Sequence, residues 1–81
     1  MRVTIRFFAR LRDIAGTADV IREVPQGGTV ETAWLALAAE FPDMARYRGS
    51  VSVAVNAEYG RFSQALADGD ELVFLPPVSG G

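Results

Sequence analysis

The groups in this sequence that could carry chemistry are few, and the clearest of them lies at the carboxyl end. The chain has 81 residues and contains no cysteine, histidine or lysine. It therefore lacks a thiol nucleophile, the commonest general base and the commonest protein metal ligand. Its last eight residues are FLPPVSGG. Because Gly80 and Gly81 have no functional side chains, the terminal carboxyl group is the one group there that can be activated.

The tail has two parts of opposite character. Pro76 and Pro77 fix two φ angles and remove two hydrogen-bond donors, so the chain leaves its last strand in an extended form. Gly80 and Gly81 lack a Cβ atom and can pass through a narrow channel. From Pro76 to the end the chain reaches up to roughly 20 Å. A stiff stem with a slender tip suits the delivery of a terminal carboxylate into the active site of another protein.

Other candidate sites in the sequence have simpler explanations. Six carboxylates lie near expected turns, but no base, nucleophile or metal ligand accompanies them, and charged turns are usually just solvated. They are Asp13, Asp19, Glu23, Asp68, Asp70 and Glu71. The QGGT stretch that ends at Thr29 could bind an anion on backbone N–H groups, yet it lacks the longer glycine pattern or lysine of a phosphate loop. We therefore expect no catalytic pocket, bound cofactor or metal site in this chain.

The pattern of apolar residues predicts four strands and one main helix. Residues 2–8 alternate, with Val3, Ile5 and Phe7 on one face and Phe8 on the other. A helix begins after the N-cap Thr29 and ends at Pro42, and its apolar stripe, which includes Trp34, accounts for that tryptophan as a core residue. The remaining predicted elements are a helical turn within 9–16 that stops at Gly16, and strands at 19–24, 50–56 and 71–75.

One helix with one apolar stripe covers one face of a sheet. We therefore expect an α+β fold, a ubiquitin-like β-grasp, with a mixed four- to five-stranded sheet and one main helix packed on one face. The predicted domain is 1–75, and residues 76–81 form an extended Gly-Gly tail.

The face of the sheet away from this helix should carry several apolar side chains. Alternation places Phe8, Val73 and Leu75 there, and Tyr59 lies just beyond the third predicted strand. A group of apolar residues on an uncovered face near the end of the chain indicates a protein-binding surface. A helix too narrow to cover the sheet would produce the same pattern without any function.

Charge and hydropathy exclude several classes of partner. The formal net charge is −2 and like charges do not occur in blocks, so a nucleic-acid surface is not expected. No stretch approaches the length of a membrane span, and MRVTIRFFAR lacks the apolar core of a signal peptide. We expect a cytoplasmic protein that does not bind membranes.

Three stretches together resemble a known family. FFARLRDIAG near the start, DGDEL before the last strand and FLPPVSGG at the end are similar to the sulfur-carrier small subunits of molybdopterin synthase, the MoaD type of the MoaD/ThiS ubiquitin-like family. The resemblance spans essentially the whole chain. A double glycine alone is shared with thiamine-pathway carriers and ubiquitin-like modifiers, whereas the opening and the ending together are more specific.

The resemblance implies a function for the tail. An E1-like, MoeB-type enzyme would use ATP and magnesium to adenylate the carboxylate of Gly81, which then becomes a thiocarboxylate, with Gly80 as the slender residue behind it. The chain would dock on the large, MoaE-type subunit of molybdopterin synthase, as a heterotetramer, and give its sulfur to the pyranopterin precursor to form the molybdopterin dithiolene. The catalytic residues would belong to the large subunit.

The resemblance also implies which residues meet the partner. Phe8, Tyr59 and Leu75 match the apolar contacts to the large subunit, and Tyr59 and Leu75 are positions where variation is expected. The full set of residues expected at partner interfaces is Phe8, Tyr59, Val73, Leu75, Pro76, Pro77, Val78 and Ser79.

Other functions stay open on the sequence alone. The chain could carry sulfur for another, thiamine-type pathway, or it could be a ubiquitin-like modifier joined to lysines of target proteins. The absence of lysine excludes chains linked through its own side chains but not single conjugation. A passive interaction domain would leave the Gly-Gly end unexplained.

Overall fold

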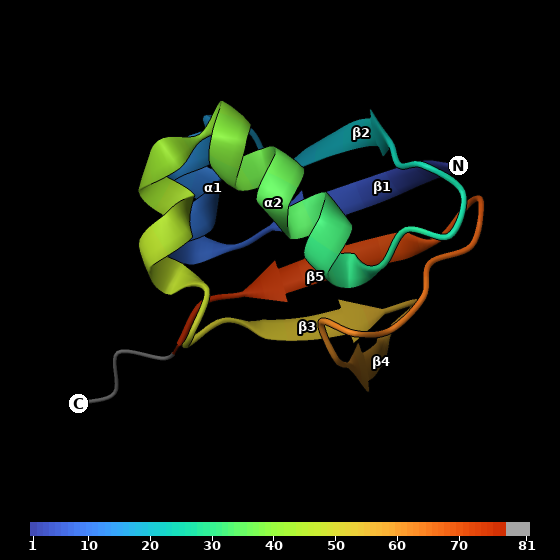
Figure 1. The fold of residues 1–81 in the computed structure, drawn as a ribbon. Coiled ribbons are helices and arrows are strands. Elements are labelled where there is room, and N and C mark those ends of the chain that lie inside the picture. The colour runs from blue at the N-terminus through green and yellow to red at the C-terminus, as the bar shows by residue number, and fades with distance from the viewer. Residues whose placement is uncertain (78–81) are drawn as a thin grey trace.

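The computed structural model describes residues 1–77, and Figure 1 shows a sheet with one long helix crossing one of its faces. The strands are β1 (Arg2–Phe7), β2 (Asp19–Glu23), β3 (Ser52–Val55), β4 (Glu58–Gly60) and β5 (Glu71–Leu75). The helices are α1 (Ala9–Ala15), α2 (Val30–Glu40) and the 3₁₀-helix η1 (Pro42–Tyr47).

The sheet is mixed, as predicted. Its strand order is β2-β1-β5-β3-β4, with β1 and β5 parallel at the centre and the other neighbouring pairs antiparallel. Parallel neighbours end at the same edge of a sheet, and Phe7 of β1 is the partner of Phe74 of β5. The residues that follow these two strands therefore leave the sheet side by side. The architecture is the ubiquitin-like β-grasp expected from the sequence.

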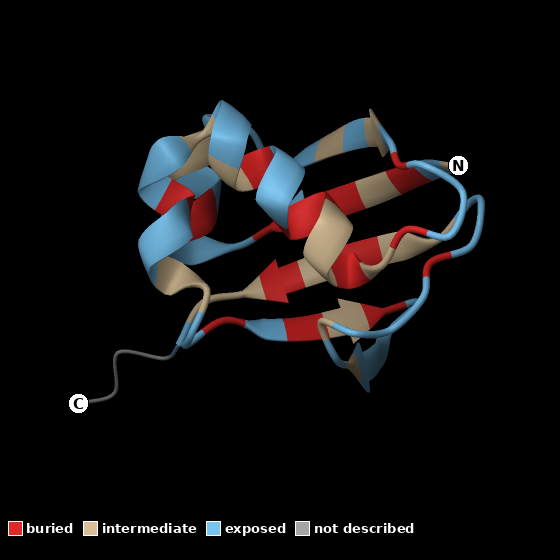
Figure 2. Cartoon of the chain, in the orientation of Figure 1, coloured by how far each residue is buried: buried red, intermediate tan, exposed pale blue. Residues whose placement is uncertain are grey.

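The core lies between α2 and the sheet, where Figure 2 shows the buried residues of both facing each other. Val3, Ile5 and Phe7 are buried on the α2 side of β1, as their alternation predicts. Trp34 of α2 is 1% exposed, and its ring meets that of Phe74 edge to face, with the centroids 4.9 Å apart. Trp34 is thus the core residue that the sequence predicts.

A reciprocal capping box fixes the start of α2. The Thr29 side chain accepts a hydrogen bond from the backbone N–H of Thr32, and the Thr32 side chain accepts one from the backbone N–H of Thr29. The N-cap prediction is confirmed, with threonine in the place of the more usual acidic or amide residue at the third helical position. At the other end α2 stops at Glu40, and Pro42 opens η1, a helix that the sequence did not predict.

The second half of the sheet differs in detail from the prediction. β3 is shorter than the expected 50–56, because Asn56 and Ala57 turn with positive φ angles of 51° and 70°. The chain then returns as β4, which was not predicted as a separate strand. An Asn-Gly pair is the usual signal for such a turn, and alanine at the second position conceals it.

β5 has the predicted bounds, whereas the first two strands each end one residue early. β1 ends at Phe7 rather than Phe8, and β2 ends at Glu23 rather than Val24. Phe8 keeps an extended backbone, with φ −129° and ψ 156°, but serves as the N-cap residue of α1. Gly16 ends α1 in the left-handed conformation, as its position predicts.

Candidate functional site

The face of the sheet opposite α2 carries a row of apolar side chains. Val73 of β5 pairs with Ala54 of β3, which in turn pairs with Tyr59 of β4. Leu75 lies two residues beyond Val73 and therefore on the same face. Tyr59 is 85% exposed, and the other three are partly exposed. The pairing of β3, β4 and β5 thus brings together residues that lie far apart in the sequence.

Phe8 completes this group from the other central strand. Its side chain is 47% exposed, whereas the preceding Phe7 is 2% exposed. Arg6 is the partner of Val73 and Phe7 the partner of Phe74, so the same register carried one residue further sets Phe8 beside Leu75. We call Phe8, Ala54, Tyr59, Val73 and Leu75 the apolar patch. The structure gathers all four residues predicted for the open face and adds Ala54, which the sequence analysis missed.

Charged residues border the apolar patch. Arg6 lies on the open face between Asp19 and Val73, and its Nε is 3.5 Å from a carboxylate oxygen of Glu71. Both side chains of this pair are about half exposed. An apolar centre with a polar border is the usual composition of a protein–protein interface.

The root of the tail lies next to the apolar patch. Pro76 and Pro77 follow Leu75 directly, and Pro77 is exposed. The predicted site residues Val78, Ser79, Gly80 and Gly81 lie outside the described residues. The parallel pairing of β1 and β5 therefore places Phe8 and Leu75, one end of the patch, at the edge of the sheet where the tail begins.

Two of the carboxylates near turns, Asp68 and Asp70, accept hydrogen bonds from the protein. Asp68 accepts a hydrogen bond from the backbone N–H of Arg2 at 2.7 Å. Asp70 accepts from the N–H of Ala67 at 2.8 Å and from the side-chain amide of Asn56 at 2.9 Å. Within residues 1–77 there is no cluster of three potential metal ligands and no pocket. Asp68 and Asp70 thus have a structural role in the loop before β5.

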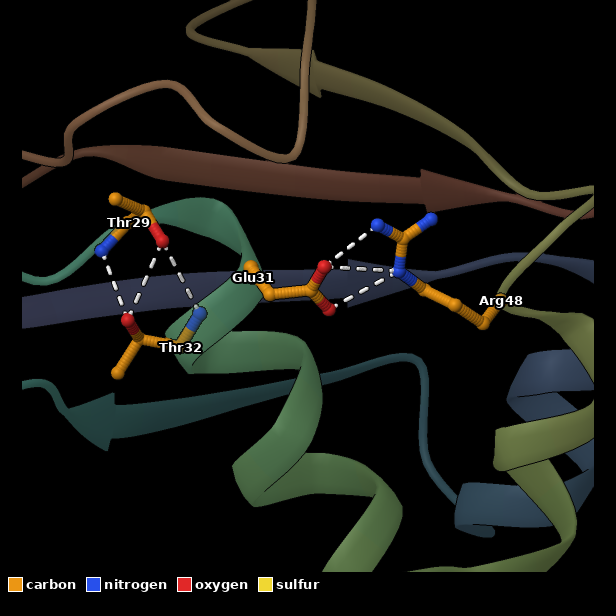
Figure 3. Close-up of polar contacts among 4 residues, drawn as sticks. All are labelled: Thr29, Glu31, Thr32 and Arg48. Atoms are coloured by element: carbon orange, nitrogen blue, oxygen red, sulfur yellow. Dashed lines mark hydrogen bonds and ion pairs between the residues drawn. The ribbon is translucent and has the colours of Figure 1, made fainter.

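The backbone N–H groups at the start of α2 have protein acceptors. Gly28 donates to the carbonyl of Pro25, Val30 to that of Gln64 and Glu31 to that of Phe62, at 2.9, 3.0 and 2.9 Å. The N–H groups of Thr29 and Thr32 are used by the capping box (Figure 3). The N–H groups of residues 28–32 therefore all have acceptors within the protein, which favours a turn over an anion site for QGGT.

A charged contact that the sequence analysis missed joins α2 to the residue after η1. Arg48 Nε donates to both carboxylate oxygens of Glu31, at 3.1 and 3.0 Å, and Arg48 Nη2 donates to one of them at 2.5 Å (Figure 3). These hydrogen bonds lower the pKa of the Glu31 carboxyl, and partial burial, which raises it, is the smaller effect. The Arg48 guanidinium also lies 3.5 Å from the centroid of the Phe62 ring. The 17-residue separation follows no helix or strand period, so no sequence signal could have revealed this pair.

No helix among residues 1–77 is both long enough and apolar enough to span a membrane.

The chain is similar to characterised proteins over its full length. The pattern of the ThiS family matches residues 5–81. A "molybdopterin synthase sulfur carrier subunit" of Arabidopsis thaliana is 33% identical, and the match spans 100% of this chain and 84% of that protein. The protein of the same name from Escherichia coli is 36% identical over 98% of this chain and 99% of its own length.

Two solved structures show the range of proteins with this architecture. The crystal structure of small archaeal modifier protein 1 from Haloferax volcanii has a TM-score of 0.86 and 30% identity, covering 95% of this chain and 98% of that one. The crystal structure of the BexX/CysO complex from Amycolatopsis orientalis contains a chain with a TM-score of 0.75 and 28% identity, covering 98% of this chain and 99% of that one.

Proposed function

Because this chain belongs to the ThiS family, we propose that it is a sulfur carrier and, more specifically, the sulfur-carrying small subunit of a molybdopterin synthase. The observation that carries the proposal is the full-length similarity to proteins that bear that name. The apolar patch, one end of which adjoins the start of the tail, gives such a subunit a surface for docking.

The proposed chemistry takes place at the carboxyl group of Gly81. In the active site of an E1-like adenylating enzyme, a carboxylate oxygen attacks the α-phosphorus of magnesium-bound ATP, and pyrophosphate leaves. A hydrosulfide equivalent then attacks the acyl carbon and AMP leaves with the electron pair of the broken bond, which yields a thiocarboxylate. Activation is needed because AMP is a far better leaving group than an oxide ion, and the sulfur product is a stronger nucleophile than the original carboxylate.

The second half of the proposed reaction belongs to a partner. The apolar patch docks on the large subunit, two copies of each chain form a heterotetramer, and the tail enters the partner's active site. There the thiocarboxylate sulfur bonds to a carbon of the pyranopterin precursor and an oxygen substituent leaves that carbon. Water then cleaves the thioester to Gly81, which leaves the sulfur on the pterin and a free carboxylate on the carrier, and two such deliveries build the dithiolene. Residues Pro76, Pro77, Val78 and Ser79 form the stem of the tail that passes into that site, and the large subunit supplies the acid–base groups. We place the reaction in the cytoplasm, where the activating enzyme and ATP are available.

A ubiquitin-like modifier is the second candidate, because a structure 30% identical to this chain is that of an archaeal modifier protein. In that function the activated carboxyl group of Gly81 would form an isopeptide bond with a lysine of another protein. A thiamine-type sulfur carrier is a third candidate, since it would form the same thiocarboxylate. The fate of the activated carboxyl group distinguishes the three functions.

The test is a reconstitution followed by mass spectrometry. The purified chain is incubated with an E1-like adenylating enzyme of its own organism, ATP, magnesium and sulfide. We expect the mass to rise by the difference between one sulfur and one oxygen atom, with the change on Gly81 in a terminal-peptide digest. The product should convert the pyranopterin precursor only when the large subunit is added. A variant with one residue added after Gly81 serves as the control and should remain unmodified.

The outcomes separate the candidates. A thiocarboxylate that is consumed with the large subunit and the precursor supports the proposal. A thiocarboxylate that is inert toward them but active in thiazole formation supports the thiamine-type carrier. Recovery of the chain from cells mainly as adducts on lysines of other proteins, without a thiocarboxylate form, would overturn the proposal in favour of the modifier.

A further inference from the structure

One residue beside the apolar patch has an unusual backbone conformation. Ala9, the first residue of α1, has a φ angle of +50°. Besides glycines, only Asn56 and Ala57 share a positive φ among the described residues, and those two form the turn between β3 and β4. Residues with a side chain seldom adopt this region, because Cβ approaches the backbone. Such positions are retained where the surrounding structure requires them, often beside functional surfaces.

The residues around Ala9 show why the chain bends there. Phe7 is 2% exposed and Leu11 is fully buried, yet Phe8 between them is 47% exposed on the opposite face of the sheet. The chain must therefore pass from the core to the open face and back to the core within five residues. A corner at Ala9 makes this path possible without withdrawing Phe8 from the open face.

Backbone hydrogen bonds hold Phe8 on both sides of the corner. The N–H of Phe7 donates to the carbonyl of Ala18 at 2.9 Å, which anchors the end of β1. The carbonyl of Phe8 accepts from the N–H groups of Leu11 and Arg12, at 3.1 and 3.4 Å, which anchors the start of α1. Phe8 is thus restrained on both sides. The φ angle of Ala9 is one of the torsions that turn the chain after the Phe8 carbonyl so that the N–H groups of Leu11 and Arg12 reach it.

We infer that Ala9 is a positioning residue whose left-handed backbone holds the Phe8 side chain in the apolar patch, beside Leu75, before any partner arrives. The inference rests on the proposed function, in which the patch docks on the large subunit. An aromatic anchor held in its bound position loses less conformational entropy on docking. Alanine suits the corner because a β-branched side chain is strongly disfavoured at positive φ, whereas asparagine tolerates it.

The first test measures the conformation of the free chain by nuclear magnetic resonance. A positive φ brings the amide and α protons of one residue close together, so Ala9 should show a strong intraresidue Overhauser effect. The ring of Phe8 should show contacts with Leu75. Ala9→Asn should keep both signals, and Ala9→Val should lose both. Ala57→Val, which places the same strain in the turn at the far end of the sheet, should leave the Phe8–Leu75 contact unchanged.

The second test measures binding to the large subunit by calorimetry. Ala9→Val should weaken binding about tenfold, as expected if the left-handed conformation is lost, whereas Ala9→Asn should bind like the wild type. In the Phe8→Ala background Ala9→Val should cause almost no additional loss, because the residue it positions is already gone. A merely structural role for Ala9 would give the same tenfold loss in both backgrounds.

The possible results distinguish this inference from the proposed function. If Phe8→Ala weakens binding to the large subunit but Ala9→Val does not, the positioning role of Ala9 is refuted. The sulfur-carrier proposal then remains intact. A wild-type chain that does not bind the large subunit would refute the proposed function itself. If Ala9→Val does not fold, the wild-type Overhauser signals still decide: absence of the Ala9 signal or of the Phe8–Leu75 contact overturns the inference.

Discussion

Gly28 illustrates how a single residue in an apparently ordinary turn is constrained by its surroundings. A Cβ atom added at this position would lie 2.5 Å from a methyl carbon of Val24 and 2.9 Å from the carbonyl oxygen of Pro25. The N–H of Gly28 bonds that same carbonyl, and its own carbonyl accepts from Leu66 at 3.0 Å. The backbone on both sides is thus fixed, and the clash cannot be relieved by a side-chain movement alone.

We expect Gly28→Ala to reduce the free energy of unfolding by about 1–3 kcal/mol, the usual effect of inserting an atom into a packed site. Urea denaturation followed by circular dichroism measures this change. Gly49→Ala is the matched control, because a Cβ there meets nothing within 4 Å, and it should change stability by less than about 0.5 kcal/mol. Equal effects of the two substitutions would contradict the assigned packing.

Among the elements, α2 and η1 are held together by a contact between their ends. Glu31 in the first turn of α2 receives the Arg48 guanidinium from the residue after η1, and that guanidinium covers the ring of Phe62. Phe62 in turn stacks on Phe74 of β5, with centroids 6.1 Å apart. The pair therefore connects the helical layer to the loop that leads into the last strand.

The stabilisation from this pair should depend on pH. The hydrogen bonds with Arg48 lower the pKa of Glu31 below its ordinary value of 4.5. A carboxyl with a lowered folded-state pKa stabilises the protein above the unfolded-state value and loses this effect as pH falls through the folded-state value. The stability difference between wild type and Glu31→Gln should therefore be complete above pH 4.5 and diminish below it.

The measurement is a series of denaturation curves between neutral and acidic pH. Glu58→Gln provides the control, because Glu58 is exposed on β4 and forms no ion pair with any residue in 1–77. The difference in stability between Glu58→Gln and the wild type should not diminish comparably as the pH falls. A Glu31→Gln difference that is constant with pH would show that the ion pair does not stabilise the folded state.

At the scale of the whole molecule, the apolar patch and the tail should contribute to separate steps of the proposed function, which are docking and sulfur delivery. The patch lies on the sheet face away from α2, and the core lies on the other side of the same strands. A change at the patch surface can therefore leave the core intact. The tail begins beyond β5, and we expect a change at its tip to leave the sheet and the patch intact.

We expect Phe8→Asp to weaken binding to the large subunit by about 2–4 kcal/mol, as for loss of a buried aromatic anchor, while the fold is retained.

Gly80→Leu should bind nearly as well as wild type but fail to convert the precursor, because its side chain would block a narrow channel. Calorimetry, circular dichroism and a single-turnover assay test these expectations. Normal turnover by Gly80→Leu, or unchanged affinity of Phe8→Asp, would contradict the separation of docking and delivery.

Much of the local structure could be predicted from the sequence, because it depends on short periods. Alternation in residues 2–8 predicted the buried face of β1, and the N-cap Thr29 followed by an apolar stripe predicted the start of α2 and the burial of Trp34. The outward direction of Phe8 and Val73 followed from the same alternation. β4 and η1 were missed, since a three-residue strand and a short 3₁₀-helix contain too few residues to show a period.

The sequence by itself indicated the types of the longer elements, the two faces of β1, β3 and β5, and the group at Gly81 that is available for chemistry. The tertiary structure decided which strands are neighbours, and with that which residues meet. Only the parallel pairing of β1 with β5 sets Phe8 beside Leu75 at the root of the tail, and only the packing of α2 against the loop after η1 brings Arg48 to Glu31. The physical reason is that side-chain period is a local property of the chain, whereas strand order and long-range contacts depend on how the whole core packs.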